Sequence, residues 1–489
     1  MENLVVQAKK KVTLDKYVSS VKISATNDIK EVLNASANSV INVVERANNV
    51  VTLSGKLLVN IIYLSQDEQI LSAETVVDFI EKQQVTTDLK NMYAKDYATI
   101  KIDTFSGTEL LCSVTHNTYI YGIYSYEVAD FVGENTSFVL NKKSFNSLKL
   151  MAASDDNFLV AEEVESNILN MKVLSSRAKV LSVESVSAVD KVVVSGKILA
   201  EVIYTDGEVV QELLKELEFK QEIEAESVLP NMLVDTNLEI KNITVTPEDK
   251  ENKINIIYAI DVFAKSYVYD ETTYEVAADM FSLENEIQNT YDYLELNNYS
   301  SKKETNDMVM SSTNVSNIDN FDDIVGVYMP QVSIDNIVKE DKKVYAEGKI
   351  TAFALYKTSN DIKRLEVVRD IKLEFSCDEN EIYDEVYAVA EISSFKVKAG
   401  KELEVAFKVS GAMTFVKTLN ESFIKSYEIK DAKNKADCGI KVYVTKKGES
   451  VFDVAKVLSV RPETILEQNE VDDVFEQGEK IYVYSPINC

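Results

Sequence analysis

The sequence predicts a mainly β protein with three tandem β-rich repeats, each a sandwich or a barrel, followed by a small domain of strand–helix–helix–strand order. Valine, isoleucine, threonine and tyrosine recur in runs, which favours strands, and only 5 prolines and 13 glycines interrupt the 489 residues. One strand-like motif occurs three times at similar spacing. After residue 440 the apolar residues change to helical spacing, which sets the last segment apart.

The length supports this division, because about 150 residues per domain gives about three domains and a small extra one. The expected boundaries follow from the spacing of the repeated motif and from one polar, Ser- and Asn-rich stretch that predicts a linker. They are 1–145 for repeat 1, 146–295 for repeat 2, 296–320 for the linker, 321–435 for repeat 3 and 440–486 for the C-terminal domain.

The repeated motif is a Gly-Lys pair followed by an apolar residue, with a tyrosine eight positions after the glycine. It occurs as VVTLSGKLLVNIIY, KVVVSGKILAEVIY and KVYAEGKITAFALY, around Gly55, Gly196 and Gly348. A second motif, YEV or YEI, follows each copy at a near-constant distance, from Tyr126, Tyr274 and Tyr427. Two motifs in the same order three times over indicate an internal repeat.

Each motif alternates like a half-buried strand. In the second copy the polar parity carries Ser195, Lys197 and Glu201, and the glycine lies on the apolar face, where it leaves room for a ring or a close backbone. The other parity is apolar: Val192, Val194, Ile198, Ala200, Val202 and Tyr204. Similar alternation later in each unit predicts six or seven strands, with one short helix near residues 27–35 of the first unit and 321–328 of the third.

A nucleotide-binding loop is excluded. The Gly-Lys pair of such a loop is followed by Ser or Thr, whereas Leu57, Ile198 and Ile350 follow it here. The net charge of −29 at pH 7 and pI near 4.6 disfavour nucleic acid and anionic membranes as partners. We expect no secretory signal at the N-terminus and no membrane span, because no run of about 18 apolar residues occurs.

No catalytic, metal or cofactor motif is evident, so we expect a protein that is not an enzyme and that needs no cofactor. The single histidine, His116, shares strand parity with Cys112 and Val114, which predicts a buried, hydrogen-bonded side chain. The four cysteines lack the spacing of a disulfide framework or a zinc site, so reduced thiols are expected. They are Cys112, Cys377, Cys438 and Cys489.

The C-terminal domain has clear helix signals. Ser450 suits an N-cap, and Asp453 three residues later completes a capping-box pair. Pro462 opens a second helix, and Asn469 is expected to end it in the left-handed conformation. A closing strand follows at 481–484.

These residues resemble a LysM domain, through Tyr443, the Gly-Glu-Ser turn at 448–450, the helix that starts at Val451, Asn469 and the GEKI segment from Gly478. The resemblance implies a shallow groove for an N-acetylglucosamine chain or another ligand. The groove and the second helix would present Gly448, Glu449, Ser450, Val451, Phe452, Ile465, Leu466, Asn469, Glu470 and Val471. For Phe452, Ile465 and Leu466, packing in the core of a small domain is the alternative. An acidic rim and a chain without Trp disfavour glycan and leave protein binding open.

Tandem repeats of the (S/N)GK strand followed by one LysM domain resemble the SPOCS-domain proteins of spore-forming Firmicutes. The resemblance implies a non-enzymatic scaffold in the mother-cell cytoplasm, at the outer forespore surface and in the spore coat. Its LysM domain would bind a SpoIVA-like coat ATPase, and other coat proteins are further candidate partners. The main alternative is a carbohydrate-binding module for peptidoglycan or cortex; a hydrolase with a LysM targeting domain would need a catalytic site that the sequence does not show.

Overall fold

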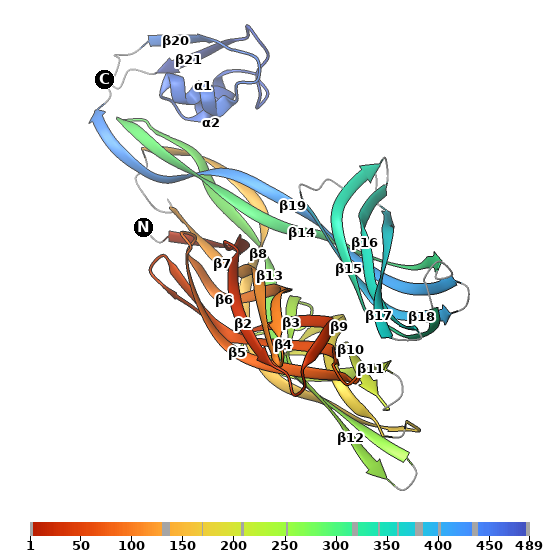
Figure 1. Cartoon of the computed structure of the whole chain (residues 1–489). Coiled ribbons are helices and arrows are strands. Elements are labelled where there is room, and N and C mark those ends of the chain that lie inside the picture. The colour runs from red at the N-terminus through yellow and green to blue at the C-terminus, as the bar shows by residue number, and fades with distance from the viewer. Residues whose placement is uncertain are drawn as a thin grey trace.

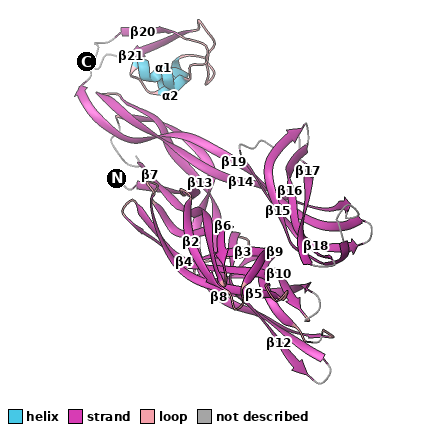
Figure 2. Ribbon diagram, viewed as in Figure 1, coloured by secondary structure: helices cyan, strands magenta, loops and turns pink. Residues whose placement is uncertain are grey.

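The structure is a computed structural model. It describes residues 3–129, 137–168, 170–206, 210–250, 253–314, 321–340, 343–358, 361–376, 385–399, 402–432 and 439–485. Strands dominate this part of the chain, and its two helices, α1 (Val451–Leu458) and α2 (Pro462–Gln468), both lie near the C-terminus (Figure 2). The prediction of a mainly β protein is confirmed. No helix in the described ranges has the length and apolar character needed to cross a membrane.

The strands fall into three groups and one C-terminal pair. The first group is β1 (Asn3–Thr13), β2 (Tyr17–Ser24), β3 (Ile29–Ala47), β4 (Val50–Ser65), β5 (Ile70–Gln84), β6 (Leu89–Ser106) and β7 (Glu109–Ala129). The second is β8 (Phe138–Ser166), β9 (Lys172–Ala188), β10 (Lys191–Thr205), β11 (Val210–Glu224), β12 (Leu233–Lys250) and β13 (Lys253–Ser282). The third is β14 (Asn285–Asn314), β15 (Phe321–Glu340), β16 (Lys343–Thr358), β17 (Asp361–Ser376), β18 (Glu385–Ala399) and β19 (Glu402–Ala432). The final pair is β20 (Gly439–Val444) and β21 (Lys480–Ser485).

The three groups share one antiparallel topology. In the second group β9, β10 and β11 form one sheet, with the motif strand β10 in the centre. The last strand, β13, is central in the other sheet, between β8 and β12. The third group repeats this order. In the first group, two strands replace the single long strand that begins the other groups: β1 and β2 pair with successive parts of β7. The sheets stay open, and none closes into a barrel within the described ranges.

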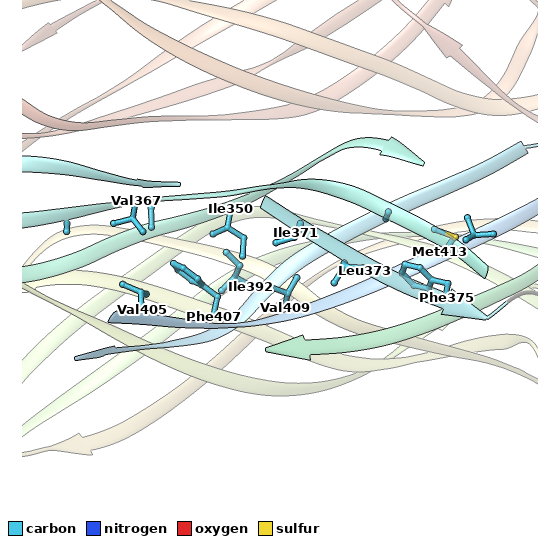
Figure 3. Close-up of a cluster of buried hydrophobic side chains, with 14 of the residues drawn as sticks. Ile350, Val367, Ile371, Leu373, Phe375, Ile392, Val405, Phe407, Val409 and Met413 are labelled. Atoms are coloured by element: carbon cyan, nitrogen blue, oxygen red, sulfur yellow. The ribbon is translucent and has the colours of Figure 1, made fainter. Parts of the chain in front are cut away.

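Each group buries an apolar core between its two sheets. In the third group, side chains of β16 and β17 meet those of β18 and β19 (Figure 3). The core includes Ile350, Val367, Ile371, Leu373, Phe375, Ile392, Val405, Phe407, Val409 and Met413. Such two-layer packing explains the alternation in sequence, because one face of each strand points inward.

The glycine of each motif meets a close backbone, as predicted. A Cβ atom at Gly55, Gly196 or Gly348 would collide with a carbonyl oxygen of the neighbouring strand. At Gly55 and Gly196 a phenylalanine ring also lies within 3.0 Å of that position. The partner strands have bulges beside these glycines, which bring their backbone inward.

The predicted linker at 296–320 is wrong for residues 296–314, which are the second half of β14 and pair with β19. Residues 315–320 lie outside the described residues. Among the described residues β14 pairs with one strand and so lies at a sheet edge, where polar side chains are common. The boundaries predicted after residues 145 and 295 fall inside β8 and β14. Neither position separates two strands, and the remaining domain limits stay a prediction.

The two short helices predicted within the repeats are wrong. Residues 29–35 belong to β3, and 321–328 belong to β15. Both strands carry bulges here, such as the register shifts between Ile29 and Glu31 and between Val32 and Asn34. The bulges interrupt the strand alternation and leave Glu31 exposed, so the buried Ile29 and Leu33 show the four-residue spacing that a helix also has.

The three groups also pack against one another. Ile62, Ile203 and Leu355, each next to the tyrosine of its motif, lie in one buried cluster with residues of all three groups. A second shared cluster forms where the ribbons β1–β7, β8–β13 and β14–β19 meet. Figure 1 shows the ribbon of β14 and β19 running from the third sandwich toward the C-terminal domain. Because of this packing, Glu201 on the expected polar face is only 4% exposed and pairs with Arg177 and Lys179.

Candidate functional site

The C-terminal domain has the strand–helix–helix–strand order that the sequence predicts. Strands β20 and β21 pair antiparallel, and the two helices pack on one face of this small sheet. The buried apolar side chains of the domain are Val451, Phe452, Val454, Ala455, Ile465, Phe475, Ile481 and Val483.

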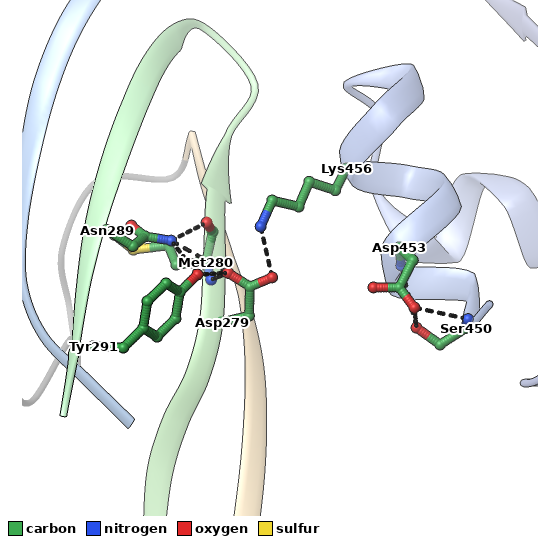
Figure 4. Close-up of polar contacts among 7 residues, drawn as sticks. All are labelled: Asp279, Met280, Asn289, Tyr291, Ser450, Asp453 and Lys456. Carbon is green, nitrogen blue, oxygen red and sulfur yellow. Dashed lines mark hydrogen bonds and ion pairs between the residues drawn. The ribbon is translucent and has the colours of Figure 1, made fainter. Parts of the chain in front are cut away.

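Helix α1 begins as predicted. The backbone N–H of Asp453 donates to Ser450 Oγ (3.2 Å), and the N–H of Ser450 donates to Asp453 Oδ2 (2.9 Å), which completes a capping box (Figure 4). The helix ends at Ser459, whose φ of 51° is left-handed. The start of α1 is thus determined locally by its own side chains.

Helix α2 starts at Pro462, as predicted, but the expected left-handed stop at Asn469 is wrong. Asn469 is extended, with φ −136° and ψ 140°. Its Nδ2 donates to the carbonyls of Ile465 (3.0 Å) and Tyr482 (2.8 Å), and its Oδ1 accepts from the N–H of Tyr482 (2.9 Å). The side chain ties the end of α2 to β21, so no left-handed residue is needed.

The loop after β20 lies against the segment that precedes β21. The N–H of Gly448 donates to the Phe475 carbonyl (3.0 Å), and the N–H of Val451 donates to that of Asp473 (3.0 Å). The N–H of Phe475 returns a bond to the Glu449 carbonyl (2.9 Å). Backbone hydrogen bonds therefore connect the loop of residues 448–451 with the segment that follows α2.

Glu449 is engaged within the domain. The hydroxyl of Tyr443 donates to its Oε1 (2.9 Å), and the N–H of Lys446 donates to its Oε2 (2.7 Å). The hydrogen bond to Glu449 raises the pKa of the Tyr443 hydroxyl. This carboxylate thus stabilises the turn at residues 446–449.

The ten predicted groove residues differ in accessibility. Ile465 is fully buried, and Val451 and Phe452 are nearly so, which makes them core side chains of this domain. Leu466, Gly448 and Glu470 are exposed, while Glu449, Ser450, Asn469 and Val471 are half-buried. Their role in binding a ligand stays a prediction.

Helix α1 packs against the second sandwich. The rings of Phe452 and Phe281 of β13 meet edge to face at 5.3 Å. Lys456 Nζ lies 2.6 Å from Asp279 Oδ2, and Asp279 also accepts from the hydroxyl of Tyr291 (2.7 Å; Figure 4). Burial raises the pKa of Asp279, but the hydrogen bonds from Lys456 and Tyr291 outweigh it and hold that pKa below its usual range. This side of the domain is therefore occupied within the chain.

Sequence reasoning missed an exposed apolar face on the small sheet. It is formed by Ile440, Val442 and Val444 of β20 and Tyr482 and Tyr484 of β21, and we call it the outer sheet face. In the opposite parity, Ile481 and Val483 are buried under the helices. The sequence did contain a signal for this face. In β21, Ile481 and Val483 alternate with Tyr482 and Tyr484, so both faces of the strand are apolar or aromatic, while the two helices cover one face.

One known protein family matches the part of the chain that contains the second motif strand, β10. The family described as "SipL, SPOCS domain" matches residues 171–248, which contain β9, β10, β11 and most of β12. No curated protein and no solved structure matches the chain. The matched stretch includes the Gly196 motif that occurs three times in the sequence. The chain is therefore a SipL-like SPOCS-domain protein.

Proposed function

We propose that this chain is a non-enzymatic adaptor of spore coat assembly, in which the C-terminal domain is a LysM domain that binds the coat ATPase SpoIVA. It would act in the mother cell, at the outer forespore surface. The observation that carries the proposal is the SipL SPOCS match at residues 171–248, which indicates a sporulation and coat-related role.

The arrangement of the chain supports an adaptor. Shared apolar clusters join the three sandwiches, so they form one connected body. The C-terminal domain lies at one end of this body (Figure 1) and contacts it through α1. In this arrangement one face of the C-terminal domain is attached to the three sandwiches, and its other faces would remain accessible to a partner.

The test is a binding measurement with purified full-length chain and purified SpoIVA-type ATPase. We expect saturable binding that is lost when residues 439–485 are deleted. Retention of binding after the deletion would move the contact to the sandwiches. Absence of binding by the full-length chain would overturn the adaptor proposal.

The alternative is a carbohydrate-binding domain for peptidoglycan or cortex. The order strand–helix–helix–strand favours this alternative, because LysM domains have the same order. Two observations count against it: Glu449 is held by Tyr443, and the exposed rim carries Glu470, Asp472 and Asp473. Titration of the full chain with N-acetylglucosamine oligomers separates the two, since saturable micromolar binding would favour the sugar.

A further inference from the structure

The outer sheet face exposes five large apolar or aromatic side chains. The exposed fractions are 67% for Ile440, 54% for Val442, 56% for Val444, 48% for Tyr482 and 56% for Tyr484. The register pairs Ile440 with Tyr484 and Val442 with Tyr482, so the five side chains are contiguous. One charged residue, Lys480, lies opposite Val444 at the end of this face.

The two edges of this sheet differ. Along β21 the edge is closed by side-chain amides of α2 and the residue after it. Gln468 accepts from the N–H of Tyr484 (2.7 Å) and donates to its carbonyl (3.2 Å), and Asn469 makes the same pair of bonds to Tyr482 (2.9 and 2.8 Å). Strand β20 has β21 as its one strand neighbour among the described residues. Among the described strands, β20 is therefore the edge at which this sheet can be extended.

We infer that β20 accepts an extended strand of the partner protein, apolar on alternate residues. This inference rests on the proposed adaptor function and names the surface that would serve it. An added strand would supply backbone hydrogen bonds along β20, and its apolar side chains would extend the face formed by Ile440, Val442 and Val444. Side chains on one face of a strand recur every two residues, which determines the pattern that the partner needs.

A second copy of this chain fits the surface less well. The outer sheet face exposes on the order of 500 Å² of apolar area, as large functional patches do. Two such faces would bury on the order of 1,000 Å² in total, which is below the usual size of a stable interface. Each copy also carries a net charge of −29, so two copies repel each other.

The test compares Val442→Glu with Val457→Glu in the full-length chain. Val442 is 54% exposed on the outer sheet face, and Val457 is 62% exposed on α1, so neither substitution removes a core side chain. The probes are the purified SpoIVA-type ATPase and a synthetic peptide of alternating valine and serine. We expect at least tenfold weaker binding of both probes by Val442→Glu and unchanged binding by Val457→Glu. Unchanged thermal unfolding confirms that both variants fold.

Hydrogen exchange supplies a second measurement, in which β20 amides should become protected when either probe binds. Equal binding by wild type and Val442→Glu, or unprotected β20 amides in the complex, would overturn the surface. If the peptide behaves as expected but the ATPase does not bind, the adaptor proposal fails and the surface stands. If the ATPase binds all variants equally, the adaptor proposal stands and the surface fails. A concentration-dependent dimer that Val442→Glu abolishes would overturn the choice of partner.

Discussion

Gly196 lies where two neighbours leave no room for a methyl group. A Cβ atom there would collide with the carbonyl oxygen of Ser182 and lie 3.0 Å from the ring of Phe219. We expect Gly196→Ala to lower the free energy of unfolding by about 2 to 3 kcal/mol, because the backbone of the neighbouring strand cannot move away without loss of pairing. Urea unfolding of the full chain measures it. Gly439→Ala is the control, since no atom lies within 4 Å of its Cβ position, and an equal loss there would contradict the explanation.

His116 is fully buried at the inner face of the first sandwich, as its strand parity predicts. Its Nδ1 lies 2.5 Å from Asp96 Oδ2, and its Nε2 lies 3.1 Å from Ser19 Oγ. Burial raises the pKa of Asp96, but the hydrogen bonds from His116 and Thr118 outweigh it and hold that pKa below its usual range. The histidine therefore compensates a buried carboxylate.

Loss of the His116 side chain should destabilise the folded chain. We expect His116→Leu to lower the free energy of unfolding by about 3 kcal/mol, because Asp96 then stays buried without its main partner. The double variant His116→Leu, Asp96→Leu should regain part of this loss, since no unpaired charge remains. Urea unfolding at pH 7 compares the two, and a double variant that is less stable than the single one would refute the pairing argument.

At the scale of elements, the attachment of α1 to β13 depends on Phe281, which is 2% exposed and packs against Phe452. We expect Phe281→Ala to weaken this attachment by about 3 kcal/mol, through lost burial and the cavity that remains. Hydrogen exchange of the α1 amides should become faster as the helix loses its support. Tyr293→Ala, at a side chain that is 67% exposed on β14, is the control and should leave the α1 amides unchanged.

The elements of the C-terminal domain were predictable because their signals are local. Ser450 with Asp453 starts α1, and Pro462 starts α2, whatever the rest of the chain does. The second half of β14 gave no such signal, because its polar residues depend on pairing with β19, which follows about a hundred residues later. The starts of β3 and β15 were predicted as helices for a related reason. They carry bulges, and a bulge can be recognised only from the pairing with a partner strand.

At the scale of the whole molecule, Glu212 responds to the packing of the three sandwiches. It lies opposite Ile203, a residue of the cluster that joins all three groups. Burial, together with the nearby Glu201, raises the pKa of Glu212 to about 8. Because an unfolded glutamate has a pKa of about 4.3, the folded chain keeps a proton that the unfolded chain loses between about pH 4.3 and pH 8. Stability should therefore fall as the pH rises through this window.

We expect Glu212→Gln to remove that pH dependence and to raise the free energy of unfolding at pH 8 by about 1 kcal/mol or more, with little change at pH 4. Urea unfolding across this pH range measures it. Glu224→Gln is the matched control, because Glu224 is exposed on the same strand, β11. A wild-type and a Glu212→Gln curve that run parallel would contradict the assignment.

The sequence by itself determined the β class, the repeated strand with its inward glycine, the burial of His116 and the helix starts of the C-terminal domain. These features depend on near neighbours in the chain, such as the alternation around Gly196 or the pair Ser450 and Asp453. Only the tertiary structure decided that Glu201 is buried, that Phe452 faces Phe281, and that Ile440 and Val442 stay uncovered on β20. The physical reason is that burial on the second face of a strand or helix depends on which distant element packs there, and alternation within one strand does not contain that information.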